Sequence, residues 1–360
     1  MINHECLEIS TICKAFVFFS FICHVFLSCG PIENNESENY SIYTNYNETD
    51  ISIVLEEELI PYAERFQELS SSCTVAEKFL FFSDPHLLGY NTILSLNEKS
   101  TFEKSFETMR ALYEYLPLDF CLCGGDWLNN SDTQDSAKDK LIYSDKLMKE
   151  WFAPYYKMMG NHDTNYQGII SENDKSRGDL PYDFINNVYY SDIGKAYYSI
   201  KGENTLFYIL DTGIDWFPHI DNYRFEQIAW LASNLAVNEE PHIVIGMHMF
   251  YNAKVDSSSI LPMSREVLDL CSAFNKRGVY EYNTVKADFT AAHGIVHFFI
   301  SGHNHVDFVC DEYDIPCIGI TRLISEGQPS FDLCLVDYNT GVLNTIRVGS
   351  GQNRNIPIVK

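Results

Sequence analysis

Short apolar runs alternate with amphipathic segments along most of the chain after residue 73. Short apolar runs are typical of buried strands, whereas apolar residues at every third or fourth position indicate one face of a helix. The runs predict strands over 79–82, 118–123, 155–159, 197–200, 205–210, 243–246, 295–301 and 315–320, and a hairpin over 331–348. Helices are expected from a capping box at Ser100 to Glu103 and over 138–152, 224–237 and 264–276. This order of elements, without an internal repeat, predicts one layered α/β domain with mixed sheets.

The first 72 residues have a different pattern. The apolar run over 15–27 is too short to span a membrane and has the length of the hydrophobic part of a signal peptide. Ser28 and Cys29 follow it as in a loose bacterial lipobox, so we expect a signal over 1–28, with plain cleavage and lipidation of Cys29 both open. Residues 29–72 open with an acidic, Asn-rich stretch and are expected to be a tether and linker. The protein is therefore predicted to be exported, either secreted or periplasmic, or anchored to a membrane through Cys29.

Composition narrows the function classes. With 46% hydrophobic and 21% charged residues, the chain is not disordered, a coiled coil or collagen-like. Its 50 Asp and Glu against 25 Lys and Arg give a net charge of −25, which argues against binding long nucleic acids. The same charge repels phosphate-bearing substrates unless bound cations reverse its sign locally. Of the 11 cysteines, Cys310 and Cys317 are placed to bridge a short hairpin, and most others are expected to be buried thiols.

Polar side chains follow five of the predicted strands at the point where each strand ends. They are Asp84 and His86, then Asp126, then Asn161, His162 and Asp163, then His248, and finally His303 and His305. The carboxyl ends of parallel strands meet at one edge of an open α/β sheet, where ligands bind. Each residue taken alone can belong to a turn or be a core residue whose polar atoms are hydrogen-bonded. Burying all of these polar groups without partners would cost much free energy, and binding to cations would give each of them a partner.

The residue types indicate which cations. Asp, His and Asn without Cys suit Mn, Fe, Zn, Co or Ni. The set exceeds what one tetrahedral ion needs, so two divalent ions are predicted. A pair of such ions can clamp the attacking and leaving oxygens of a phosphoryl transfer.

These blocks, Asp84-x-His86, Gly125-Asp126, Gly160-Asn161-His162-Asp163, His248 and Gly302-His303-x-His305, resemble in the same order those of the calcineurin-like metallophosphoesterase superfamily. The resemblance implies a four-layer α/β/β/α sandwich of mixed sheets, with the catalytic domain over 73–360. It implies that one metal is held by Asp84, His86 and His305. It implies that the other is held by Asn161, His248 and His303, with Asp126 bridging both.

The resemblance also implies an activity. The chain would be a metal-dependent hydrolase of phosphate mono- or diesters, acting by in-line attack of a hydroxide that bridges the two metals. His162 would assist the leaving group as a general acid or transition-state stabiliser, and its imidazole would be oriented by donating a hydrogen bond to Asp163. Small-molecule phosphate esters are the expected substrates. The alternatives are a cyclic-nucleotide or nuclease-like phosphodiesterase and, from another class, a non-catalytic metal-binding scaffold.

Other residues are open to two interpretations. Asn129 stands where purple acid phosphatases carry a metal-binding tyrosine, so no purple chromophore is expected. Asp211 can contact a metal-binding histidine or cap a turn, and Arg322 and Arg354 can grip a phosphate or form surface ion pairs. Trp127, Tyr166, Trp216 and His219 can line the substrate cleft or pack in the core. The loops over 91–101, 164–187, 214–222 and 251–263 carry no motif that identifies the substrate, and oligomeric state is not predicted.

Overall fold

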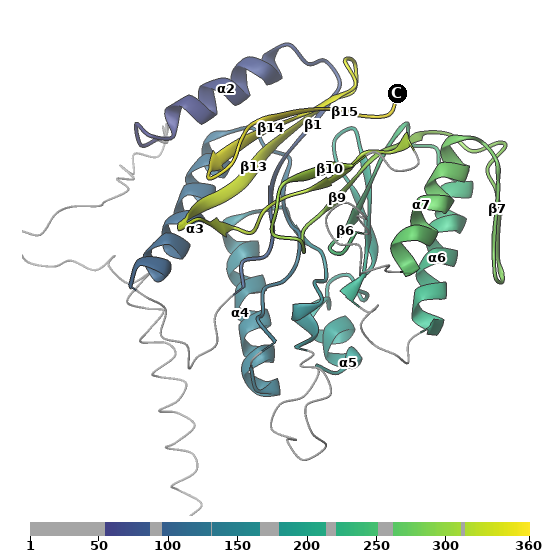
Figure 1. Cartoon of the computed structure of the whole chain (residues 1–360), viewed down its shortest axis with the longest axis horizontal. Helices are drawn as coiled ribbons and strands as arrows, with labels where there is room; N and C mark the ends of the chain where they lie inside the picture. The colour runs from purple at the N-terminus through teal and green to yellow at the C-terminus, as the bar shows by residue number, and fades with distance from the viewer. Residues whose placement is uncertain are drawn as a thin grey trace, which may run out of the picture. The chain divides into compact units, whose positions relative to one another are not determined.

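Two mixed β-sheets form the centre of the unit that begins at Ile53 (Figure 1). The computed structural model describes residues 55–86, 96–130, 132–165, 180–213, 221–250, 262–310 and 314–360. The first sheet has the order β15-β14-β13-β1-β2-β3, with β12 paired to β13. Its strands are β1 (Ala76–Phe82), β2 (Phe120–Cys123), β3 (Tyr155–Lys157), β12 (Ile324–Ser325), β13 (Gln328–Asp337), β14 (Val342–Gly349) and β15 (Arg354–Pro357). Strands β1, β2 and β3 are parallel, and β13 runs antiparallel to β1.

The second sheet has the order β10-β11-β9-β6-β5-β4. Its strands are β4 (Tyr198–Lys201), β5 (Leu206–Leu210), β6 (His242–Met247), β9 (Ile295–Ser301), β10 (Phe308–Cys310) and β11 (Cys317–Gly319). The four inner strands are parallel, so their carboxyl ends reach the same edge. A separate hairpin joins β7 (Val279–Tyr282) to β8 (Val285–Asp288).

Helices cover the outer face of each sheet. Helices α2 (Ile60–Ser71) and α3 (Leu96–Tyr115) pack on β13 and β14, and α4 (Gln134–Trp151) joins the same core. Helices α6 (Asp221–Ala236) and α7 (Pro262–Asn275) lie on the other side, over the second sheet (Figure 1). Short turns of helix follow β3 at His162–Thr164, α5 (Tyr182–Phe184) and Ile185–Tyr189. The layers are therefore helix, sheet, sheet and helix, as the family resemblance implied.

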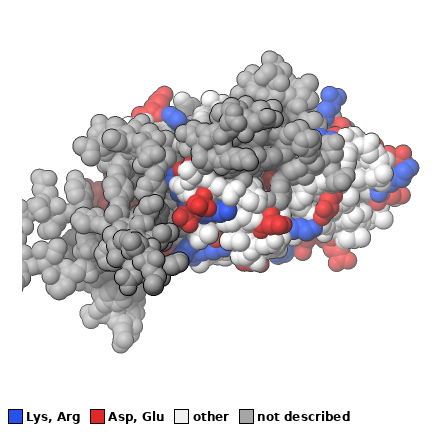
Figure 2. Space-filling view, turned by 90° about the horizontal axis from the view of Figure 1, so that it is seen from below, with Lys and Arg blue, Asp and Glu red and all other residues white. Residues whose placement is uncertain are grey.

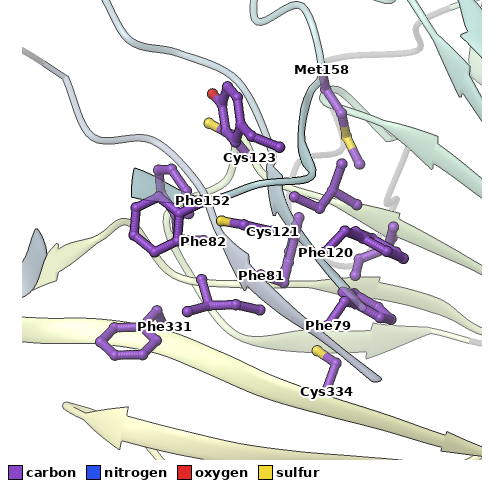
Figure 3. Packing of buried hydrophobic residues seen from close by; sticks show 14 of the residues in the cluster. Phe79, Phe81, Phe82, Phe120, Cys121, Cys123, Phe152, Met158, Phe331 and Cys334 are labelled. Atoms are coloured by element: carbon purple, nitrogen blue, oxygen red, sulfur yellow. The ribbon is translucent and has the colours of Figure 1, made fainter. Parts of the chain in front are cut away.

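Aromatic side chains fill the space between the two sheets. Phe79 of β1 stacks on Phe120 of β2 with ring centroids 5.1 Å apart. Phe207 of β5 meets these rings edge-on, at 5.6 Å from Phe79 and 5.2 Å from Phe120. Figure 3 shows Phe79 and Phe120 within the cluster of buried side chains. This packing holds the two sheets in a fixed relation, so the loops at their edges have a rigid support.

Most of the predicted strands and helices are present, with shifts at their ends. The capping box is wrong as a helix start, because α3 already begins at Leu96 and contains Ser100. Residues 60–71, assigned to the linker from the sequence, form α2, whose Phe66 is fully buried. Only Ala63 and Phe66 of this helix are buried, so its apolar stripe is too narrow to stand out in the sequence. Strand β15 and the β7–β8 hairpin were not predicted.

The expected signal over 1–28 and the lipidation of Cys29 lie outside the described residues. Among the helices that the structure describes, none combines the length and the apolar character needed to cross a membrane. Cys310 and Cys317 are opposite each other in the β10–β11 hairpin, but the disulfide bridge that the sequence suggested for them is not formed. Of the two strands, only that of Cys317 was predicted.

Candidate metal centre

The predicted ligands meet where the strands of both sheets end. Their backbones are unusual, since several adopt a left-handed conformation that only glycine visits at little cost. The φ angles are 54° at Asp84, 44° at His86, 61° at Asp126, 69° at His303 and 54° at His305. Such a conformation costs about 1–3 kcal/mol per residue and persists where the surroundings enforce it, which is common at functional sites.

Four side chains form one ligand cluster: Asp84, His86, Asp126 and His305. Their ligand atoms all lie within 4.8 Å of one another. The Nε2 atom of His305 is 3.3 Å from Oδ1 of Asp84, and Nε2 of His86 is 3.9 Å from both Asp84 Oδ1 and Asp126 Oδ2. These separations suit side chains that point at a common central cation.

A second cluster shares Asp126 and adds His248 and His303. Nε2 of His248 lies 3.1 Å from Oδ2 of Asp126. Asn161 adjoins this cluster, because its Oδ1 lies 2.9 Å from Nδ1 of His303. The structure thus brings together all seven ligands that the sequence proposed, and it places Asp126 in both clusters.

Backbone carbonyls orient two of the imidazoles. The Nδ1 of His86 is 2.9 Å from the carbonyl oxygen of Leu128, and the Nδ1 of His248 is 2.6 Å from that of Gly124. A carbonyl oxygen only accepts, so Nδ1 carries a hydrogen in both rings, and Nε2 is the atom that points into the cluster and would bind a cation once it is deprotonated. Nε2 of His248 and Oδ2 of Asp126 are buried without a hydrogen-bond partner. The residues therefore fit a cation, which would satisfy both atoms.

The electrostatics of the metal-free protein agree with this. Burial lowers the pKa of His248, but the carboxylates of Asp126 and Asp84 outweigh burial and raise it to about 9. Burial and the charge of His248 lower the pKa of His303 to about 4, and burial also lowers that of His86. The carboxylates thus stabilise the protonated imidazole of His248, and a cation that binds there would displace that proton.

Two glycines allow the close packing of these loops. A Cβ on Gly160 would lie 2.1 Å from Oδ1 of Asp126. A Cβ on Gly302 would lie 1.9 Å from Oγ of Ser83 and 2.7 Å from Oδ2 of Asp84. Any side chain at either position would push a carboxylate out of its cluster.

His162 lies at the open side of the ligands. Its Nε2 is 4.0 Å from Oδ2 of Asp126, and its ring meets that of His86 edge-on with centroids 4.9 Å apart. Its side chain is 32% exposed, whereas Asp126 is buried, so it can reach a molecule that approaches the carboxylate from solvent. Its backbone N–H donates to Oδ1 of Asp126 at 2.8 Å, which fixes the start of this turn.

Asp163 does not make the contact expected from the sequence. Its buried carboxylate accepts backbone N–H groups instead. The donors to Oδ1 are Trp127 at 2.6 Å and Leu128 at 3.3 Å, and the donors to Oδ2 are Asp126 at 2.9 Å and Gly160 at 3.0 Å. The Nδ1 atom of His162 is buried without a hydrogen-bond partner. Asp163 therefore fixes the loop that carries Asp126, and it does not orient the imidazole of His162.

The structure also decides several of the open interpretations. Arg354 pairs with Asp332 at 2.7 Å, away from the ligands, so it does not grip a phosphate there. Trp127 is buried against Phe82 and Phe106, as expected of a core residue. Asn129 donates from Nδ2 to the carbonyl oxygen of His86 at 3.3 Å and so shapes the ligand loop.

Of the remaining candidates, Asp211 and Arg322 lie within the described residues. The backbone N–H and carbonyl of Asp211 bond to the side chain of Gln227. Arg322 is exposed. Tyr166, Trp216 and His219 lie outside the described residues, as do most of the loops expected to govern the substrate.

Comparison with known proteins extends this result. A family model for calcineurin-like phosphoesterases matches residues 77–307, which is more than half of the chain and includes every proposed ligand. The chain belongs to the calcineurin-like phosphoesterase family.

This calcineurin-like phosphoesterase is also similar to solved structures. A dimetal phosphatase from Danio rerio is 13% identical with a TM-score of 0.48, over 79% of this chain and 99% of that one. A phosphopantetheinyl hydrolase from Mycobacterium tuberculosis is 14% identical with a TM-score of 0.39, over 69% of this chain and 90% of that one. No curated protein matches the chain. These likenesses are distant, and the family assignment depends on the family model.

Proposed function

We propose that this phosphoesterase hydrolyses phosphate mono- or diesters at a centre of two divalent metal ions. The observation that carries the proposal is the carboxylate of Asp126, which belongs to both ligand clusters and has His162 beside it. Asp84, His86 and His305 would hold the first ion, and Asn161, His248 and His303 the second. The oxygen and nitrogen donors suit Mn, Fe, Zn, Co or Ni.

When bound, such ions neutralise phosphate charge and lower the pKa of water to the point where hydroxide is available for in-line attack on phosphorus. The chain's own residues prepare the site for this chemistry. The carbonyl oxygens of Gly124 and Leu128 fix the rings of His248 and His86, so no reorganisation is needed when substrate binds. The four amides held by Asp163 fix the loop of Asp126 in the same way.

His162 is the proton donor in this proposal. Its exposed edge lies next to the ligands, and a protonated imidazole there can donate to the leaving-group oxygen as the ester bond breaks. A poor leaving group needs this proton most, because its oxygen carries the most negative charge as it departs.

The expected substrates are small-molecule phosphate esters. The net charge of −25 disfavours long nucleic acids. On the face drawn in Figure 2, the Lys and Arg side chains of the described residues are interspersed with Asp and Glu. Export through the segment 1–28, with or without a lipid on Cys29, belongs to the same proposal and would place the enzyme outside the cytoplasm.

Hydrolysis of p-nitrophenyl phosphate and of bis-p-nitrophenyl phosphate, each assayed with Mn, Fe, Zn, Co and Ni, tests the proposal. We expect metal-dependent activity on at least one ester and its loss in Asp126→Asn. Asp139→Asn, which changes an exposed carboxylate on α4, is the matched control and should behave as the parent. A protein that binds metal but hydrolyses neither ester nor a wider ester panel would instead be a metal-binding scaffold.

A further inference from the structure

The imidazole of His305 is more exposed than those of His86 and His248, and its Nε2 lies 2.9 Å from Nε2 of His86, another proposed ligand. Its side chain is 37% exposed, compared with 0% for His248 and 13% for His86. Its backbone is left-handed, with a φ of 54°. Apart from these contacts with the other proposed ligands, the position of its ring depends on what holds the loop between β9 and β10.

That loop is held by a buried arginine from the other sheet. Arg347 of β14 donates from Nη1 to Oδ2 of Asp307 at 2.8 Å and from Nη2 to Oδ1 at 2.7 Å. Asp307 comes two residues after His305. Its Oδ1 also accepts the N–H of Thr321 at 3.1 Å, and the hydroxyl of Thr321 donates to the carbonyl oxygen of His305 at 2.8 Å. The loop is thus fixed on both sides of Val306.

Arg347 is itself immobilised. Its side chain is 1% exposed, and its Nε donates to Oδ1 of Asp332 at 2.7 Å. Nη1 also donates to the carbonyl oxygen of Ser350 at 3.0 Å. Gly351 leaves room for the guanidinium, since a Cβ there would lie 2.1 Å from Nη1. A planar fork held in this way defines the orientation of the carboxylate that it binds, which a lysine ammonium does not.

We propose that Arg347 is a positioning residue for the metal ligand His305, acting through its two hydrogen bonds to Asp307. This inference rests on the proposed dinuclear centre. It assigns a role to a residue outside the region 77–307 that the family model matches. If the inference is correct, loss of the two hydrogen bonds lowers the affinity for the ion held by Asp84, His86 and His305. The affinity for the ion held by Asn161, His248 and His303 should change much less.

The test is a Mn²⁺ titration of the full chain, followed by the EPR signal of free Mn²⁺, for the parent, Asp307→Asn, Arg347→Lys and His305→Ala. Asp307 is the safer site to change, because it is 28% exposed and Arg347 keeps Asp332 as its partner. The parent should bind two ions. Asp307→Asn and Arg347→Lys should lose about 10- to 100-fold in affinity for one of them, as is usual for a residue that supports a metal ligand.

His305→Ala shows which ion is affected, and an excess of Mn²⁺ should restore two bound ions in Asp307→Asn. Arg354→Gln is the matched control, because Arg354 pairs with Asp332 in the same network without touching Asp307. Arg354→Gln should bind both ions as the parent does. This expectation holds even where thermal unfolding shows that it destabilises the metal-free protein as much as Asp307→Asn does.

Two outcomes overturn the inference separately. If the parent binds two ions and Asp307→Asn binds both with unchanged affinity, only the positioning role is wrong. If the parent binds no Mn²⁺, Zn²⁺ or Co²⁺, the proposed function is wrong and the positioning role fails with it. If both affinities fall equally in Asp307→Asn, the network stabilises the fold and not the loop of His305.

Discussion

Replacing Asp163 by asparagine separates two roles for this residue. In the structure each carboxylate oxygen accepts two backbone N–H groups, from Trp127 and Leu128 on one side and from Asp126 and Gly160 on the other. An asparagine has one oxygen and one NH₂ group, so in either orientation the NH₂ group faces two amide donors. Asp163→Asn therefore leaves two buried N–H groups without an acceptor.

The magnitude follows from the number of lost acceptors. Each buried group left without a partner costs about 1–3 kcal/mol, so the free energy of unfolding should fall by about 2–6 kcal/mol. Urea unfolding of the metal-free protein, monitored by far-UV circular dichroism, measures this change. Asp139→Asn is the control for a carboxylate-to-amide change at an exposed position, and it should be nearly neutral.

One result would refute the reasoning. If Asp163→Asn unfolds at the same urea concentration as the parent and only the pH profile of hydrolysis changes, the residue acts on the imidazole of His162. That was the role expected from the sequence, and the hydrogen bonds to the four amides would then contribute little.

Three further predictions concern other parts of the molecule. His162→Ala should lower the hydrolysis rate of alkyl phosphates by about 10²–10⁴-fold and that of p-nitrophenyl phosphate less, with unchanged metal content by elemental analysis. Burial lowers the pKa of His297 from 6.5 to about 4, so between these pH values the unfolded chain binds more protons than the folded protein does. The free energy of unfolding should therefore fall by about 3 kcal/mol as the pH drops from 6.5 to 4, as measured by urea denaturation at each pH. Phe66→Ala should destabilise the protein by about 3–5 kcal/mol in urea unfolding, because α2 is part of the core.

Each of these has a result that contradicts it. Equal rate losses on alkyl and p-nitrophenyl esters in His162→Ala would argue against proton donation to the leaving group. An unchanged pH dependence of stability in His297→Gln would show that other groups control acid unfolding. A Phe66→Ala protein as stable as the parent would mean that α2 is dispensable, in line with the linker expected from the sequence.

That the proposed ligands lie together could be predicted because each follows a strand that is itself evident in the sequence. The apolar runs before Asp84, Asp126 and His303 mark the strands, and parallel strands bring their carboxyl ends to one edge. The direction of a side chain is not encoded in this way. Asp163 adjoins His162 in the sequence, yet its carboxylate turns to backbone amides that lie 35–37 residues earlier in the chain.

Long-range partners were the other source of error. Arg347 lies on β14 of the first sheet and Asp307, 40 residues earlier, in the loop before β10 of the second, so no local pattern links them. Helix α2 is hard to recognise because few of its residues are buried, and its stability comes from packing on β13 and β14. The conformations of loops, and the stability of helices with a narrow apolar face, depend on tertiary contacts. The periodicity of apolar residues along the sequence does not reveal these contacts.

The pairing of β1 with β13 has a consequence for synthesis. Strand β1 is among the first parts of the domain to leave the ribosome, but its antiparallel neighbour comes from residues 328–337. Until that late segment emerges, one edge of β1, whose last four residues (Phe79 to Phe82) are all apolar, has no hydrogen-bonding partner. A nascent chain stalled before β13 therefore exposes an aggregation-prone edge, and the enzyme depends on protection of this edge until translation has passed residue 337.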